Sequence, residues 1–178
     1  TKTPQGVLAV VRQMEYTLEQ MTDGVIPHLM ILDNLQDPGN LGTMIRTGEG
    51  AGITGVIMNN QTVDIFNPKT IRATMGSIFR VPFVYVPDLA PVLEQMHAKG
   101  IYTYAAHLKG QEYYDSFSFR EPTAFLIGNE GNGLSKEISD QAGQYLKIPM
   151  EGRVESLNAS IAAALLMYEA HRQRSARL

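Results

Sequence analysis

Short apolar runs alternate with longer helix-like stretches from residue 27 onward, and this alternation is the strongest constraint on the fold. The apolar runs cover residues 29–32, 55–58, 81–86, 101–106, 124–127 and 145–148. Continuous apolar runs of this length are typical of parallel strands buried on both faces of a sheet. Helical character is found at residues 38–51, 67–75, 88–99, 134–142 and 156–173. The pattern predicts an α/β domain with a mostly parallel sheet flanked by helices.

The first 26 residues do not follow this alternation. An apolar run at residues 7–11 follows Pro4-Gln5-Gly6, and we interpret it as a strand entered from a turn. Residues 12–24 mix polar and charged side chains with a few apolar ones, as in a linker or a short helix between domains. We therefore expect a boundary near residue 26, with residues 27–178 forming one domain.

Composition excludes several classes of protein. The chain has no cysteine, which excludes a disulfide scaffold, a thiolate zinc site and a cysteine nucleophile. Its net charge of −3 argues against non-specific coating of nucleic acid. No apolar run approaches the roughly 18 residues that span a bilayer, and the first residues do not resemble a signal peptide. We expect no membrane contact and a cytoplasmic location.

A polar turn with glycine follows the first apolar run of the regular pattern. Asp37 is a predicted helix N-cap with Pro38 at the first helical position. In such a helix Gly42 and Arg46 share one face, and Arg46 is expected to project near Asn40. The alternative for this segment alone is a capped helix with an ordinary surface arginine.

A second such turn follows residues 124–127. Its glycines have the spacing G-x-x-G-x-G from Gly128 to Gly133, with Glu130 as the charged residue. Glycines at a strand end let a ligand lie against exposed backbone. The alternative is a flexible turn between a strand and a helix.

A third polar turn lies between residues 148 and 160, where Ser156 and Asn158 open the last predicted helix. Unpaired N–H groups at a helix N-terminus suit an anionic or carbonyl group of a ligand. The alternative is that Ser156 is merely an N-cap. Since ligands of parallel sheets bind beyond the carboxyl ends of strands, we expect the three turns to meet in one pocket.

Other site types have no support in the sequence. It contains neither the dinucleotide motif G-x-G-x-x-G nor a Walker loop, and it lacks the G-x-S-x-G elbow of hydrolases. The histidines have no metal-ligand spacing; they are His28, His97, His107 and His171. A metal site is therefore not expected.

The three turns, in this order and separation, resemble the SpoU (TrmH-type) branch of the SPOUT RNA methyltransferases. The matching stretches are residues 37–47, 128–131 and 148–160, and the resemblance covers about residues 27–170. It implies methyl transfer from S-adenosylmethionine to a ribose 2′-hydroxyl of structured RNA, most readily 23S ribosomal RNA and otherwise transfer RNA. It also implies a C-terminal trefoil knot, a homodimer with shared active sites, and a preceding RNA-binding domain whose end is residues 1–26.

The resemblance also implies roles for individual residues. The positions that match the catalytic motif are Arg46, Asn40, Glu130, Ser156 and Asn158. The positions that match the methyl-donor site are Gly128, Ile148 and Leu157. Arginine stays protonated in proteins, so Arg46 is expected to stabilise negative charge on the ribose oxygen rather than act as a free base.

The sequence indicates RNA contacts and alternative functions less specifically than it indicates the site residues. Candidate phosphate contacts are Lys69, Arg72, Arg80, Arg153, Arg172, Arg174 and Arg177, although a charged C-terminal helix end is more often simply solvated. One alternative function is a catalytically silent RNA-binding or ribosome-assembly module on the same fold. Another is an ordinary nucleotide-binding enzyme, which the missing phosphate motifs disfavour.

Overall fold

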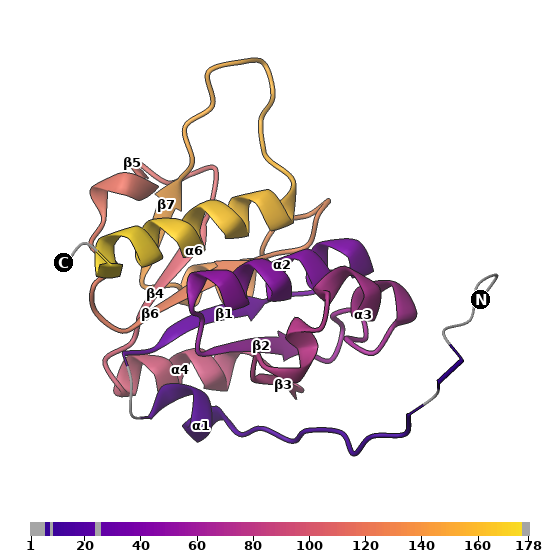
Figure 1. Ribbon diagram of the computed structural model, residues 1–178. Helices are drawn as coiled ribbons and strands as arrows, with labels where there is room; N and C mark the ends of the chain where they lie inside the picture. The colour runs from indigo at the N-terminus through magenta and orange to yellow at the C-terminus, as the bar shows by residue number, and fades with distance from the viewer. Residues whose placement is uncertain (1–5, 8, 24–25, 176–178) are drawn as a thin grey trace.

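One parallel sheet forms the centre of the computed structural model, which describes residues 6–7, 9–23 and 26–175 (Figure 1). Its strands are β1 (His28–Leu32), β2 (Gly55–Asn59), β3 (Phe83–Val86), β4 (Tyr102–Ala106), β5 (Glu112–Tyr113), β6 (Thr123–Ile127) and β7 (Gln144–Lys147). Their order in the sheet is β3-β2-β1-β6-β4-β7-β5, and every neighbouring pair is parallel. The predicted parallel sheet is confirmed, with the short edge strand β5 added.

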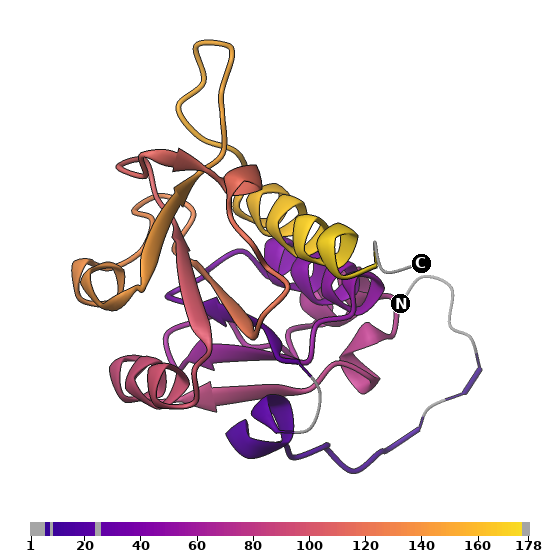
Figure 2. The same ribbon diagram turned by 90° about the vertical axis from the view of Figure 1, so that its left-hand side faces the viewer.

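Helices cover both faces of the sheet (Figures 1 and 2). They are α1 (Leu18–Thr22), α2 (Pro38–Ala51), α3 (Pro68–Thr74), α4 (Ala90–Ala98), α5 (Lys136–Gln141) and α6 (Ala159–Ser175), with 3-10 turns η1 (Ser77–Phe79) and η2 (Tyr114–Ser116). Helices α2, α3 and α6 lie on one side, and α1, α4 and α5 on the other. Among these helices, none has the length and apolar character needed to cross a membrane.

The central strands divide their side chains between two cores. In β1, Met30 and Leu32 pack toward α2 and α6, whereas Leu29 and Ile31 pack toward α1 and α4. All of β1, β2 and β6 is buried, because successive side chains point to opposite faces and both faces are covered. This two-sided burial explains why the sequence shows continuous apolar runs rather than alternation.

The start of the chain differs from the sequence prediction. Val7 and residues 9–11 are exposed and form no strand in the described part of the chain, so the predicted strand at residues 7–11 is wrong there. A strand needs a neighbour to accept its backbone hydrogen bonds, and the sheet offers none to this segment. Helix α1 packs on the sheet through Met21, which is 1% exposed. The boundary near residue 26 stays a prediction.

The strand order brings the polar turns to one edge. The chain passes from β1 through β2 to β3 at the sheet margin and then returns to β4, on the far side of β6. The direction of winding thus reverses beside β1 and β6, and ligands of parallel sheets bind beyond the carboxyl ends of the strands near such a reversal. The turns that follow β1, β6 and β7 all leave from this edge. The trefoil knot implied by the resemblance stays a prediction.

Gly42 gives a test of how closely helices α2 and α3 pack. A Cβ at Gly42 would lie 2.5 Å from the Cβ of Ala73 and 2.7 Å from the carbonyl oxygen of Thr70. We expect Gly42→Ala to lower the free energy of unfolding by about 1–3 kcal/mol, because overpacking outweighs the gain in helix propensity.

Urea denaturation measures the effect, with Gly50→Ala in the same helix as the matched control. A Cβ at Gly50 meets just the hydroxyl end of Tyr168, at 2.9 Å, which can move aside. A Gly42→Ala variant as stable as the control would contradict the close packing.

Candidate active site

The first polar turn places Asn40 in the opening turn of α2. The carboxylate of Asp37 accepts a hydrogen bond from the Asn40 N–H at 2.8 Å, and Pro38 begins the helix, as predicted. This hydrogen bond, together with Lys69 at 3.4 Å, lowers the pKa of Asp37 below its ordinary value. The cap fixes the direction in which α2 leaves the sheet, and with it the Asn40 side chain.

Glu130, from the second turn, holds the start of α2. Its Oε1 accepts hydrogen bonds from the Asp37 N–H at 2.8 Å and from the Asn40 side-chain amide at 3.0 Å. Its Oε2 accepts a hydrogen bond from the Gln36 N–H at 3.0 Å. Desolvation acts in the opposite direction, but together these donors lower the pKa of Glu130. The carboxylate therefore bridges two turns that follow different strands.

In the third turn Asn158, and not Ser156, caps the last helix. The side-chain oxygen of Asn158 accepts hydrogen bonds from the N–H of Ser160 at 2.9 Å and from its hydroxyl at 2.7 Å. Helix α6 therefore begins at Ala159, and Ser156 lies exposed in the segment before it. The predicted cap at Ser156 is wrong because the Asn158 amide oxygen captures the first free N–H groups.

A line of side chains joins the three turns; we call Glu130, Asn40 and Asn158 the amide network. The Asn158 amide donates a hydrogen bond to the side-chain oxygen of Asn40 at 3.0 Å, while the Asn40 amide donates to Glu130. Each asparagine has a partner at both ends of its amide, so neither can flip without losing hydrogen bonds. The network thus fixes three turns that are far apart in the sequence.

A pocket of about 320 Å³ lies beside the network, and Glu130 belongs to both. The pocket is bounded by the turns after β4, β6 and β7 and by the start of α6, and it includes the predicted positions Gly128, Glu130, Ile148, Ser156 and Leu157. The expectation that all three turns line one pocket is wrong for the first turn, which is joined to the others through the amide network instead. A Cβ at Gly128 would clash with the backbone of Gly133 and Leu134, so this position requires glycine. The volume is at the lower end of the roughly 300–1,000 Å³ of small-molecule sites.

One wall of this pocket consists of residues that were not predicted from the sequence. Ala106, His107 and Leu108, which end β4 or follow it, also line the cavity. The His107 ring stacks on Tyr145 with centroids 4.8 Å apart. The signal that could have revealed this wall is the same as for the other turns, because residues 107–110 form a polar, glycine-containing turn after an apolar run.

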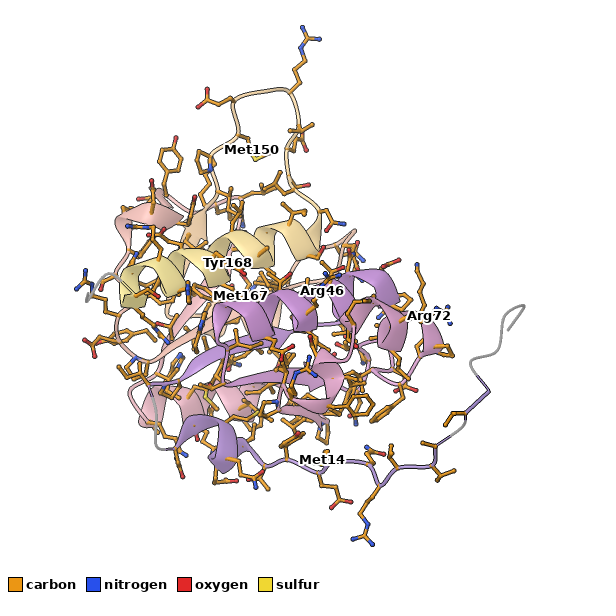
Figure 3. The ribbon with its side chains drawn as sticks, in the orientation of Figure 1. Met14, Arg46, Arg72, Met150, Met167 and Tyr168 are labelled. Carbon is orange, nitrogen blue, oxygen red and sulfur yellow. The ribbon has the colours of Figure 1, made fainter. Side chains whose placement is uncertain are left out.

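Arg46 stands apart from the amide network. It is exposed on α2, and its side chain forms no hydrogen bond or ion pair with the described part of the chain (Figure 3). Arg46 lies four residues before Gly50, where a Cβ would be 2.9 Å from the Tyr168 hydroxyl of α6. The face of α2 that carries Arg46 therefore adjoins the outer surface of α6.

No group of three or more His, Asp or Glu side chains in the described residues is arranged to hold a metal ion.

The fold and the site together define an α/β domain with a pocket of small-molecule size beside a fixed polar centre, as in enzymes whose ligands lie at the carboxyl ends of parallel strands. Residues 27–168 match the SpoU rRNA Methylase family, and the chain belongs to this family.

Similar proteins agree with this assignment. The 23S rRNA (guanosine(2553)-2'-O)-methyltransferase RlmP of Bacillus subtilis is 36% identical over 94% of this chain. The SpoU methyltransferase AviRb from Streptomyces viridochromogenes, in complex with AdoMet, superposes with a TM-score of 0.83 at 33% identity over 89% of this chain. An AdoMet-bound rRNA methyltransferase from Sinorhizobium meliloti superposes with a TM-score of 0.77 at 38% identity over 83% of this chain. The chain spans 65%, 62% and 58% of these proteins, respectively.

The role of Glu130 can be tested through pH. Since the folded-state pKa of Glu130 lies below its ordinary value of 4.5, the carboxylate stabilises the fold above that pH, and the contribution is lost as pH falls through the lowered pKa. Glu130→Gln places an amide NH₂ against N–H donors. We expect the variant to be less stable than the parent protein near neutral pH, with the difference shrinking on acidification.

Urea denaturation from about pH 7 to about pH 3 measures this convergence. Glu137→Gln, on the exposed first turn of α5, is the matched control and should follow the parent protein throughout. A constant difference between Glu130→Gln and the parent protein over this range would show that the carboxylate charge does not hold the turns.

Proposed function

We propose that the chain transfers a methyl group from S-adenosylmethionine to a ribose 2′-hydroxyl of structured RNA, in 23S ribosomal RNA or otherwise in transfer RNA. The observation that carries the proposal is the amide network beside a glycine-walled pocket, with Glu130 belonging to both, in a member of the SpoU rRNA Methylase family. We also propose a cytoplasmic location, because that is where the proposed RNA substrates are found.

The pocket residues fit S-adenosylmethionine. Ile127, Leu146 and Leu157 provide apolar surface for a flat base, and the turn from Gly128 to Gly133 leaves its backbone close to the cavity. Glycine-rich turns at strand ends suit a ligand held largely through backbone groups. When bound, S-adenosylmethionine supplies an electrophilic methyl group on a positively charged sulfur. Gly128, Ile148 and Leu157 are the residues we assign to holding it.

The chain itself has to bind and activate the ribose. A hydroxyl is a poor nucleophile until its proton is withdrawn or its oxyanion is stabilised. In the proposed transfer S-adenosylhomocysteine is the leaving group, and the hydroxyl proton passes to an RNA phosphate oxygen or to water, because Arg46 is already protonated. We assign the stabilisation to Arg46, whose guanidinium stays protonated and offers several donors. Asn40 and Asn158 orient the reacting groups, and their fixed amides mean that no reorganisation is needed during the reaction. Ser156, at the pocket wall, adds a hydroxyl that can donate or accept.

A homodimer explains how Arg46 reaches an active centre. Ile161, Leu165 and Tyr168 on α6 are 49%, 36% and 48% exposed and form one apolar stripe at helical spacing. Stripes of this kind mark protein interfaces. Because Arg46 lies one helical turn before Gly50, which neighbours Tyr168, a dimer formed through the stripe would bring Arg46 of one copy toward the other copy, and each centre would be shared.

Arg72 and Arg153 are the best candidates for RNA phosphate contacts. Both are exposed and unpaired within the described residues, and Arg153 lies in the loop between β7 and α6, which projects from the body (Figure 2). Other candidates have protein partners: Lys69 with Asp37, Arg80 with Glu49, Arg172 with Glu169, and Arg174 with backbone carbonyls. Arg177 lies outside the described residues. We assign residues 1–26 to the end of a preceding RNA-binding domain and the linker after it, with α1 of the linker packed on the sheet through Met21.

The reaction is tested by incubating the protein with S-adenosylmethionine, labelled in its methyl group, and unmodified total RNA, followed by nucleoside analysis. We expect a 2′-O-methylated nucleoside. RNA binding without methyl transfer would favour a silent RNA-binding module. A base-methylated nucleoside would exclude ribose as the acceptor.

In the same assay, Arg46→Ala should lower kcat by about 10²–10³-fold, the usual loss when one oxyanion-stabilising group is removed. Binding of S-adenosylhomocysteine should be unchanged, because Arg46 does not line the pocket. Arg120→Ala, an exposed arginine before β6, is the control. Equal loss of turnover and of S-adenosylhomocysteine binding would contradict the role assigned to Arg46.

The dimer is tested by Leu165→Glu, which places a charge in the apolar stripe. We expect the variant to sediment as a monomer and to lose methyl transfer while it still binds S-adenosylhomocysteine. Ile71→Glu on α3, which is exposed to a similar extent (38% against 36%), should sediment like the parent protein. An unchanged dimer in Leu165→Glu, or a monomeric parent protein, would overturn the proposed interface.

A further inference from the structure

Asp33 is a buried carboxyl group that belongs neither to the amide network nor to the pocket wall. It directly follows β1 and is 2% exposed. Its Oδ1 accepts a hydrogen bond from the Asn59 side-chain amide at 3.0 Å, and its Oδ2 accepts one from the Ser135 N–H at 2.8 Å. In the described part of the chain it has no ion-pair partner. Burying such a group is costly, so these hydrogen bonds must compensate for lost hydration.

One of these hydrogen bonds fixes the far end of the glycine-rich turn. The turn starts at Gly128, and its residues up to Leu134 line the pocket. Two backbone hydrogen bonds of 3.0 and 2.9 Å between Asn129 and Gly133 close it internally. Ser135 follows immediately, and Asp33 binds its N–H. Asp33 therefore sets where the turn lies relative to the end of β1.

The other hydrogen bond links Asp33 to the same turn by a second route. The Asn59 oxygen accepts hydrogen bonds from the Asn34 N–H at 3.1 Å and the Thr62 hydroxyl at 2.9 Å, which fixes the amide so that its NH₂ faces Asp33. The Asn34 carbonyl in turn accepts a hydrogen bond from the Asn129 side chain at 3.0 Å. Both ends of the pocket wall are thus tied to the residues around Asp33.

We propose that Asp33 is a positioning residue that holds the glycine-rich turn in the conformation that binds the methyl donor. This inference rests on the proposed function. Asp33 makes no hydrogen bond to Glu130, Asn40 or Asn158. It therefore governs affinity for the donor and leaves the chemical step to the amide network and Arg46.

The variant Asp33→Asn changes one oxygen to an NH₂ group. The remaining oxygen can still accept from Ser135, but the NH₂ then faces the NH₂ of Asn59. Asn59 cannot flip to relieve this repulsion without losing its hydrogen bonds to Asn34 and Thr62. Exchanging the two residues, Asp33→Asn with Asn59→Asp, restores a carboxylate opposite an amide. The Asn59 NH₂ also donates to the Asn34 side-chain oxygen at 2.9 Å, but the Asn34 NH₂ has no partner in the described residues and can turn toward the new carboxylate, so the exchange should rescue the single variant.

Calorimetric titration with S-adenosylhomocysteine gives the primary readout, and steady-state kinetics gives KM and kcat. For Asp33→Asn we expect about ten-fold weaker binding and a matching rise in the KM for S-adenosylmethionine, which is the effect of losing about one hydrogen bond. We expect kcat at saturating donor to be unchanged, and binding to recover in the exchanged double variant. Asp88→Asn, which alters the carboxylate that accepts from Ala90 N–H on α4, is the matched control.

The outcomes separate this inference from the proposed function. If the parent protein does not bind S-adenosylhomocysteine, the proposed function fails. If the parent protein binds it and Asp33→Asn binds equally well, the role of Asp33 is wrong. Loss of kcat with unchanged KM, or failure of the double variant to recover binding, would likewise overturn it.

Ser135→Pro provides a second variant should Asp33→Asn not fold. It removes the N–H that Asp33 binds at a position whose φ of −59° suits proline. We expect the same weakening of S-adenosylhomocysteine binding, and unchanged binding would contradict the proposal.

Discussion

The carboxylate of Glu130 is the interaction on which the geometry of the site depends. It binds the N–H of Gln36, 94 residues away in the chain, and the side chain of Asn40, which in turn binds Asn158. Where parallel strands end and helices begin, backbone N–H groups lack partners. Here the partners come from different turns. Satisfying these donors therefore also fixes the turns relative to one another.

Two polar networks adjoin the pocket. The pocket is lined by apolar side chains, glycine backbone and polar side chains that include Glu130, Lys147 and Ser156. The other polar groups are the asparagines of the amide network and the hydrogen bonds of Asp33 with Asn59 and Ser135. A buried polar group whose partners are all in place has one favourable conformation, so these networks make the site rigid. Rigidity matters where the reaction depends on orientation.

Electrostatics and exposure indicate what a single copy lacks. The net charge of −3 gives no general attraction to RNA, so the proposed contact with phosphates would depend on local groups such as Arg72 and Arg153. Arg46 lies outside the amide network, one helical turn before Gly50, which neighbours Tyr168 in the exposed apolar stripe of α6. The centre that we propose to be shared between two copies would account for both features, because association would cover the stripe and bring a cation to the polar side chains.

The sequence by itself determined the local elements. The continuous apolar runs identified β1, β2 and β6, and Asp37 with Pro38 marked the start of α2, because burial on both faces and helix capping leave local patterns. The tertiary structure decided which residues meet. In the folded chain Asn158 caps α6 in place of Ser156, and residues 9–11 have no neighbouring strand with which to pair. Glu130 accepts a hydrogen bond from Asn40, which lies 90 residues away in the chain. These outcomes depend on hydrogen-bond partners that the strand order brings together, and no local spacing encodes that order.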